Sequence, residues 1–334
     1  MLSILKKIPV IRRLGCSLMA ARRSFKKEFA IYTGPEDVPY EIRGERTFID
    51  RSLKVDSVLL ILAGYKSVLW DDVFGRISKF LPKGIDVCVV TSGLVNEDLK
   101  KLCERENWSY LATKRNNINL AQNIAIELHP KAEWIYKLDE DVFITKGFFE
   151  NLKATYELAK KTSRMEIGFV GPIMPLHGYG HARLLEKLNL VSEWEKRFGS
   201  LYYTEGLYDH KQIIDNPEVA KFMWGSEIPE LKDVDALNDR FAAMKPDYRI
   251  YSARFGIAAI LYSRKFWLGV GRFPVESEGC GMGADEFAFC QYCMSHSHAI
   301  VVSENSVVGH FAFGKQTKAM FEYYKILKKE EYSA

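Results

Sequence analysis

Apolar runs and segments with helical spacing alternate along the first half of this chain. The apolar runs have the length of buried strands, and each is followed by a segment in which apolar residues recur at steps of three and four. The predicted strands are Val58–Ala63, Asp86–Val90, Trp108–Ala112 and Trp134–Leu138, and the predicted helices between them are Trp70–Leu81, Asn96–Glu106 and Asn119–Leu128. This alternation predicts an α/β fold with a mostly parallel central sheet and helices on both faces.

The second half of the chain has a less regular pattern. Strands are predicted at Ile167–Val170, Ile257–Tyr262 and Ala299–Ser303, and a segment rich in aromatic rings, residues 177–250, separates the first two. A glycine-rich turn segment then leads into a short helix that begins near Ala284. The last twenty residues predict a polar helix rich in lysine.

Three carboxylates stand directly after the fourth predicted strand: Asp139, Glu140 and Asp141. Acids gathered at the end of a buried strand repel one another and are costly to desolvate, so a stable protein holds something positive beside them. Mg²⁺ and Mn²⁺ prefer carboxylate oxygens and share their other positions with phosphates. Open α/β sheets also bind ligands beyond the carboxyl ends of their strands. The pattern therefore favours a metal and phosphate site over the alternative, a solvated acidic loop.

Composition and charge narrow the class of protein. The chain has 334 residues, 47% hydrophobic and 27% charged, and its formal net charge of +4 is too small to indicate a nucleic-acid-binding protein. The cysteines show no paired framework, and Cys290 and Cys293 lie in an apolar, helix-like run, which favours reduced core thiols and a cytoplasmic protein. No apolar run reaches the roughly 18 residues of a membrane span. Basic residues interrupt the first apolar stretch, unlike in a secretory signal.

The first 27 residues form a basic segment that contains eight lysines and arginines and no acid. Apolar residues between Ile11 and Phe29 recur at steps of three and four, which places them on one helical face. A basic amphipathic helix of this kind suits an anionic membrane surface. We therefore expect a peripheral protein that meets the inner face of a membrane through residues 1–27. The alternative is a helix packed on the protein body with its charges in water.

Five short segments follow one another in a characteristic order. They are Asn116-Asn117 together with residues 120–123, the acids in residues 138–141, the arginine-containing segment 263–273, the segment 283–289, and residues 307–310 with a histidine. In this order they resemble the motifs of the GT-A (nucleotide-diphospho-sugar transferase) glycosyltransferases, and most of all the inverting family 2, in which the acids form the DxD motif. The resemblance covers roughly Val55 to Gly314.

The chain also departs from the family pattern. Ala284 replaces the usual glutamate of an acidic pair, and Gln122 replaces the usual arginine. Thr91-Ser92-Gly93 stands where relatives often have two aspartates. The arginine–tryptophan motif of processive synthases is absent, which favours an enzyme that adds a single sugar.

The resemblance implies roles for individual residues. Asp141 would bind a divalent ion, Mn²⁺ or Mg²⁺, that neutralises the leaving diphosphate, with His310 as a further ligand. Asp139 would be another ligand or would contact the ribose or a metal-bound water, and Glu140 would touch the nucleotide or cap the following turn. Asp285 would be the general base that takes the acceptor proton, and the alternatives are Glu286 or a helix-capping role. The full set of candidates is Ala63, Gly64, Tyr65, Thr91, Asn117, Gln122, Asn123, Asp139 and Glu140 for the nucleotide sugar, and Trp224, Glu286 and Arg264 for the acceptor.

The resulting hypothesis is an inverting, metal-dependent transferase. It would move a sugar from a nucleoside diphosphate, UDP by default, to a glycan or lipid-linked acceptor in surface polysaccharide or lipopolysaccharide assembly. We expect an arm and connector over residues 1–50, a catalytic domain over 51–315, and a polar C-terminal helix over 316–334. The catalytic domain would divide into a nucleotide-binding half, 51–145, and an acceptor half, 146–315, with an insert at 177–250. Two alternatives are an inactive scaffold of the same fold at a membrane and a sugar nucleotidyltransferase.

Overall fold

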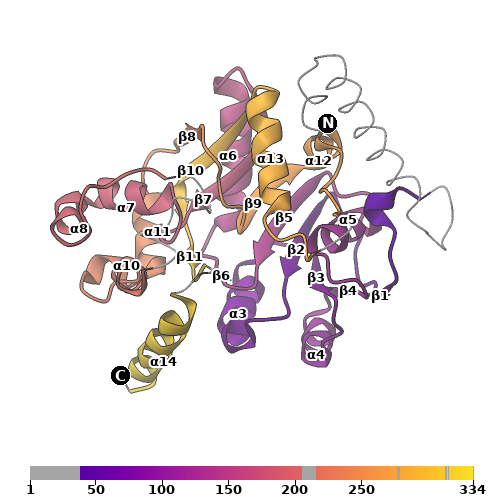
Figure 1. Cartoon of the computed structure of the whole chain (residues 1–334), viewed down its shortest axis with the longest axis horizontal. Helices are drawn as coiled ribbons and strands as arrows, with labels where there is room; N and C mark the ends of the chain where they lie inside the picture. Colours follow the sequence, from indigo (N-terminus) through magenta and orange to yellow (C-terminus); the bar gives the residue numbers. More distant parts are fainter. Residues whose placement is uncertain (1–37, 205–215, 277–278, 313, 315, 334) are drawn as a thin grey trace, which may run out of the picture.

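The computed structural model describes residues 38–204, 216–276, 279–312, 314 and 316–333. They are built around a nine-stranded sheet with the order β1-β4-β3-β2-β5-β9-β7-β10-β8, and helices cover both of its faces (Figure 1). The basic helix predicted within residues 1–27 lies outside the described residues. In the part of the chain that is described, no helix is long and apolar enough to cross a membrane.

The first half of the sheet follows the predicted alternation. Its four parallel strands each end at the same edge of the sheet, because each is followed by a crossover helix or loop. The strands are β2 (Ser57–Leu62), β3 (Asp86–Ser92), β4 (Ser109–Thr113) and β5 (Trp134–Asp139), and the helices are α3 (Trp70–Phe80), α4 (Glu97–Glu106) and α5 (Ile118–Leu128). Every element predicted here is confirmed to within two residues at each end. The polar segment before β2 also contributes a short edge strand, β1 (Arg46–Ile49), which pairs antiparallel with β4.

The second half of the sheet adds strands of both directions. β9 (Ala259–Ser263) lies antiparallel between β5 and β7 (Glu166–Ile173), β10 (His298–Val307) pairs parallel with β7, and β8 (Tyr248–Tyr251) closes the edge antiparallel to β10. Three strands, β1, β9 and β8, therefore oppose the other six, and the expected mostly parallel sheet is confirmed. The local pattern of residues did not predict the reversed direction of β9.

Most of the described part of the ring-rich insert is helical. Its elements are α7 (Gly180–Leu188), α8 (Val191–Phe198), α10 (Pro217–Met223), the short helix η3 (Pro229–Leu231) and α11 (Val234–Ala242). Trp194 is buried, and its ring lies 4.9 Å from the ring of Phe198 and 6.2 Å from that of Phe222. Many of the aromatic residues in this segment thus form its own core, which allows it to fold as a compact addition to the sheet.

Three further helices complete the described fold: α6 (Phe148–Thr162), α12 (Arg264–Val270) and α13 (Ala284–Ser295). The predicted C-terminal helix is confirmed as α14 (Thr317–Ser333). A two-stranded sheet of β6 (Val142–Phe143) and β11 (Gly309–His310) joins the turn after β5 to the end of β10. This pairing brings the strand-end acids and His310 to the same region of the molecule.

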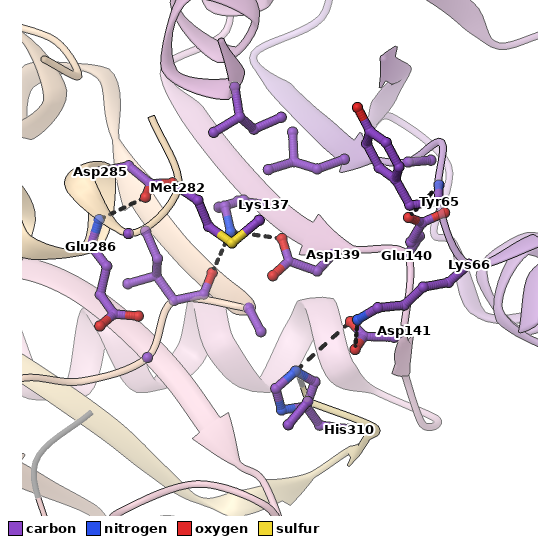
Figure 2. Close-up of a pocket in the computed structure, with 18 of the residues that line it drawn as sticks. Tyr65, Lys66, Lys137, Asp139, Glu140, Asp141, Met282, Asp285, Glu286 and His310 are labelled. Carbon is purple, nitrogen blue, oxygen red and sulfur yellow. Dashed lines mark hydrogen bonds and ion pairs between the residues drawn. The ribbon is translucent and has the colours of Figure 1, made fainter. Parts of the chain in front are cut away.

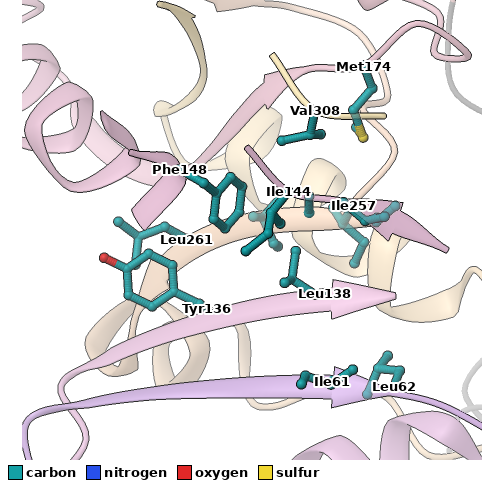
Figure 3. Packing of buried hydrophobic residues seen from close by; sticks show 14 of the residues in the cluster. Ile61, Leu62, Tyr136, Leu138, Ile144, Phe148, Met174, Ile257, Leu261 and Val308 are labelled. Carbon is teal, nitrogen blue, oxygen red and sulfur yellow. The ribbon is translucent and has the colours of Figure 1, made fainter. Parts of the chain in front are cut away.

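The core beneath the acids is tightly packed. Tyr136 and Leu138 of β5 point toward Phe148 and Ile144, and Leu261 of β9 lies beside Tyr136 (Figure 3). All five side chains are buried, and burying a large apolar side chain contributes roughly 1.5–3 kcal/mol. The Tyr136 hydroxyl also donates a hydrogen bond of 3.1 Å to a backbone carbonyl of α6. These contacts fix β5 against α6 and hold the acidic turn between them.

The cysteines agree with the expectation of core thiols. Cys88, Cys103, Cys290 and Cys293 are free and buried, whereas Cys280 is free and exposed. Burial raises the pKa of Cys290 to about 12, so this thiol stays protonated.

Candidate active site

A cavity of about 640 Å³ lies where the ends of β2 and β5 face the start of α13. Figure 2 shows Asp139, Asp141 and His310 on one side of it and Asp285 and Glu286 on the other. Among the sequence candidates, those that line the cavity are Ala63, Tyr65, Asp139, Glu140, Asp141, Asp285, Glu286 and His310. The fold thus assembles in one cavity the acids of two motifs that are far apart in the sequence.

Asp139 is paired with a lysine from its own strand. The Lys137 ammonium lies 2.8 Å from Asp139 Oδ1 and donates a second hydrogen bond, also of 2.8 Å, to the carbonyl of Ile257. Burial alone would lower the pKa of Lys137, but Asp139 and Asp285 raise it, and the net shift is upward. Lys137 therefore stays charged in the floor of the cavity, a role that sequence reasoning missed because the residue lies within an apolar strand.

Glu140 points away from its neighbours and binds the loop after β2. Its carboxylate accepts the backbone N–H of Gly64 at 3.0 Å, the backbone N–H of Tyr65 at 2.9 Å and the indole N–H of Trp70 at 2.6 Å. The side chain is buried. Glu140 therefore positions the loop on which Tyr65 stands, and its contact with a nucleotide stays a prediction.

Asp141 is buried between two basic groups. Its Oδ2 is paired with the ammonium of Lys66, and its Oδ1 lies 3.8 Å from His310 Nε2. Burial alone would raise the pKa of Asp141, but His310 and Lys66 lower it below its ordinary value, so the group is a carboxylate. Burial lowers the pKa of His310 in spite of the opposite effect of Asp141. Of the two basic groups, Lys66 is thus the one paired directly with Asp141, and His310 lies farther from it.

The predicted metal ligands Asp139, Asp141 and His310 are not assembled into a ligand set. Within the described ranges, no three side chains of His, Cys, Asp or Glu gather into a group that could hold a metal ion. Asp141 and His310 are close to each other, but Asp141 is already paired with Lys66 and Asp139 with Lys137. The residues as arranged do not fit a three-ligand site, and metal binding stays a prediction.

Asp285 lies in the first turn of α13, on the opposite side of the cavity. Its Oδ1 accepts the backbone N–H of Glu286 at 2.9 Å, and its Oδ2 accepts the side-chain amide of Gln122 at 3.0 Å. Gln122 is fully buried and does not itself line the cavity. This glutamine stands where the resembled motif has an arginine, and its hydrogen bond orients Asp285. Next to it, Glu286 pairs with Arg254 at 2.5 Å, and burial raises the pKa of Glu286 against the effect of that arginine.

Three further sequence candidates, Thr91, Asn117 and Asn123, form hydrogen bonds in the structure around the cavity. Thr91 donates to the carbonyl of Leu94 at 2.8 Å, Asn117 caps α5, and Asn123 accepts the indole N–H of Trp267 at 3.1 Å. None of these three lines the cavity, although their neighbours Ser92, Asn116 and Ile118 do.

Two of the three acceptor candidates, Arg264 and Trp224, also have structural contacts. Arg264 donates three hydrogen bonds of 2.6–2.8 Å to backbone carbonyls at the end of α5 and in the turn after it. The ring of Trp224 packs on Phe143 and Phe311, and its N–H donates to the carbonyl of His310 at 3.2 Å. Neither residue lines the cavity. Trp224 therefore supports β11, the strand that contains His310, and Arg264 binds backbone carbonyls at the end of α5 and in the turn after it.

Comparisons with known proteins find only distant structural likenesses. No family model and no curated protein matches the sequence. Among solved structures the chain is similar to GalNAc-T7 with UDP, GalNAc and Mn²⁺, at 13% identity and a TM-score of 0.46, over 78% of this chain and 45% of that one. It is also similar to the mannosyltransferase PcManGT from Pyrobaculum calidifontis in complex with GDP-Man and Mn²⁺, at 13% identity and a TM-score of 0.43, over 90% and 66% of the two chains.

A third similar structure is S. aureus TarS 1–349, at 11% identity and a TM-score of 0.41, over 76% of this chain and 60% of that one. The chain spans less than two thirds of the length of each of the three. The α/β architecture expected of a GT-A fold is confirmed by the sheet order and strand directions given above. With TM-scores below 0.5, the likenesses carry no argument about substrate, metal or mechanism.

Proposed function

We propose that this chain transfers a sugar from a nucleoside diphosphate sugar to a hydroxyl of a glycan or lipid-linked acceptor. The observation that carries the proposal is the division of charge across one cavity. Lys66 and Lys137 stand among the strand-end acids on one side, and the carboxylate of Asp285 stands on the other. A diphosphate leaving group needs positive charge on one side of the sugar, and an inverting reaction needs a base on the opposite side.

The proposed chemistry follows from these positions. The acceptor oxygen forms a bond to the anomeric carbon while its proton passes to Asp285, and the bond from that carbon to the diphosphate oxygen breaks. The electron pair of the broken bond stays on the diphosphate, and Lys66 and Lys137 are the described lysines of the cavity lining that would stabilise its charge. Gln122 and the N-terminus of α13 hold the Asp285 carboxylate in a fixed orientation. A bound Mn²⁺ or Mg²⁺ would add Lewis-acid stabilisation of the diphosphate.

The finer parts of the hypothesis stay predictions. These are UDP as the nucleotide, inversion at the anomeric carbon, a role in surface polysaccharide or lipopolysaccharide assembly, and membrane contact through residues 1–27. The division of the chain at residues 50, 145 and 315 likewise stays a prediction. The Asp285 position favours inversion, because this base stands across the cavity from the cations.

The test is turnover of donor by the wild type and by Asp285→Asn. We expect the wild type to release nucleoside diphosphate from one of a set of UDP-, GDP- and CDP-sugars when glycoside and lipid-linked acceptors are supplied. Asp285→Asn should bind the nucleotide with unchanged affinity and should lose about 10²–10⁴-fold in rate, the usual contribution of a positioned base. Binding is measured by calorimetry and turnover by chromatography of the nucleotides.

The matched control is Asp98→Asn, because Asp98 also stands in the first turn of a helix but is exposed on α4, away from the cavity. It should turn over at the wild-type rate. A wild-type rate for Asp285→Asn would contradict the assignment of the base. Release of pyrophosphate from a nucleoside triphosphate and a sugar phosphate would instead favour the nucleotidyltransferase alternative, and no turnover of any donor would favour the scaffold.

A further inference from the structure

Each strand-end acid already has its own partner within the fold. Lys137 neutralises Asp139, three N–H groups of the segment 64–70 bind Glu140, and Lys66 neutralises Asp141. A divalent ion that bound Asp141 would have to displace the Lys66 ammonium from a partly buried ion pair, and the two like charges would repel each other. The place where the sequence predicts a metal ion is therefore held by an ammonium group.

Both members of this pair line the cavity, but the more exposed of the two is Lys66. Its side chain is 18% exposed, whereas the side chain of Asp141 is only 2% exposed. A phosphate that enters the cavity therefore meets the ammonium group before the carboxylate. An ammonium has three N–H donors, so the bond to Asp141 leaves donors for phosphate oxygens. Lys137, in contrast, is 3% exposed and donates to both Asp139 and a backbone carbonyl.

Hydrogen bonds to Glu140 hold the chain on both sides of Lys66. The two residues before it, Gly64 and Tyr65, donate their backbone N–H groups to Glu140, and Trp70 holds the far end of the same segment to that carboxylate. Lys66 itself precedes the short helix η2 (Ser67–Leu69). A lysine whose backbone is held in this way loses less freedom on binding a ligand than one on a loose loop.

We propose that Lys66 binds the diphosphate of the donor in the place where a divalent ion was expected, so that nucleotide binding needs no metal. This inference rests on the proposed function and names the group that recognises its leaving group. Lys66 transfers no proton in this scheme. It stabilises the negative charge that remains on the diphosphate when the bond to the sugar breaks.

The experiment is calorimetric titration of UDP, GDP and CDP into the full chain, once with EDTA and once with Mn²⁺. We expect one of the three to bind the wild type in EDTA. Lys66→Met should weaken that binding roughly 10- to 100-fold, the usual effect of losing a charged hydrogen-bond donor. Mn²⁺ should then restore binding to Lys66→Met, because Asp141 is left without its cation and becomes available as a ligand.

Three further variants sharpen the result. Lys66→Arg keeps the charge and should bind in EDTA, which separates the loss of charge from a failure to fold. The double variant Lys66→Met/Asp141→Asn should not be rescued by Mn²⁺. Lys114→Met is the matched control, because Lys114 forms an exposed pair with Glu45 away from the cavity, and it should match the wild type.

The comparison of EDTA with Mn²⁺ on the wild type is the first test of the inference, and binding by Lys66→Met in EDTA is the second. Binding that occurs only with Mn²⁺ would overturn the role of Lys66 and would leave the proposed transferase standing. Binding in EDTA that Lys66→Met leaves unchanged would overturn it as well. Failure of all three nucleotides under both conditions would remove the proposed function itself, and the inference with it.

Discussion

Asp139, Glu140 and Asp141 are neighbours in the sequence, but different parts of the fold bind each of them. β5 ends at Asp139, and Glu140 and Asp141 lie in the turn that follows it. Asp139 meets Lys137 of its own strand, whereas Asp141 meets Lys66 from the loop after β2. At the residue scale, the acidic motif thus contains two acids that are paired with lysines and one acid that holds a loop.

The role of Glu140 can be tested with Glu140→Gln, which keeps the shape of the side chain. A carboxylate accepts all three N–H groups that reach it, but an amide offers one accepting oxygen and turns an NH₂ group toward the rest. We expect the free energy of unfolding to fall by roughly 1–3 kcal/mol, the cost of a buried donor left without a partner. Urea unfolding measures this change.

The control for that variant is Glu97→Gln, which removes an exposed pair with Lys100 on α4. Exposed pairs contribute about 0–1 kcal/mol, so the control should unfold close to the wild type. Equal urea midpoints for Glu140→Gln and Glu97→Gln would contradict the positioning role of Glu140.

The acids of the site could be predicted from the sequence, but the residues that bind them could not. The run of three carboxylates after an apolar strand is visible in the sequence, and so is the family motif that contains Asp285. Lys66, in contrast, is 75 residues from Asp141, and nothing local marks it as its partner. Gln122 likewise stands where relatives have an arginine, and the sequence does not show that its side-chain amide donates a hydrogen bond to Asp285.

At the scale of elements, the end of β3 passes very close to the chain before α5. Gly93 has a φ of +75°, and a Cβ added to it would lie 2.4 Å from Cβ of Asn116. Asn116 lines the cavity. The close approach therefore couples the turn after β3 to the proposed nucleotide side of the site.

Gly93→Ala and Gly84→Ala form a matched pair that measures this approach. Gly84 also has a left-handed φ, +92°, but an added Cβ would meet nothing within 4 Å. Both variants should lose about 1–2 kcal/mol from the left-handed conformation. Gly93→Ala should lose typically about 1–3 kcal/mol more from overpacking against Asn116. Thermal unfolding of both variants gives the difference, and equal losses would contradict the close approach.

The elements that sequence reasoning predicted best are those with the plainest pattern. β2 and β3 are continuous apolar runs because both of their faces are covered, and the helices beside them carry a regular apolar stripe. The direction of β9 is set by its pairing with β5 and β7, which no local pattern encodes. The insert reads as irregular because its helices are short, and because its aromatic residues pack on one another.

At the scale of the whole molecule, the site exists because the sheet brings two distant segments together. β5 carries the acids, β9 lies beside it in the reverse direction, and the segment after β9 leads to α13 and Asp285 on the far side of the cavity (Figure 2). The family resemblance could predict that these segments share a site, since their order along the chain is characteristic. The cations that face them, and the helical insert beside them, required the structure.

The central claim is that this cavity binds a nucleoside diphosphate, and Cys280 offers the most direct test. Cys280 is exposed and lines the cavity, whereas Cys88, Cys103, Cys290 and Cys293 are buried. The rate at which N-ethylmaleimide alkylates Cys280 can be followed by peptide mass spectrometry, and Cys16, outside the described residues, serves as an internal reference.

The measurement compares the alkylation rate of Cys280 without nucleotide and with saturating UDP, GDP or CDP, each in EDTA and in Mn²⁺. We predict that one of the three nucleotides slows alkylation of Cys280 and leaves the rate at Cys16 unchanged. An unchanged rate at Cys280 with every nucleotide under both conditions would contradict the account.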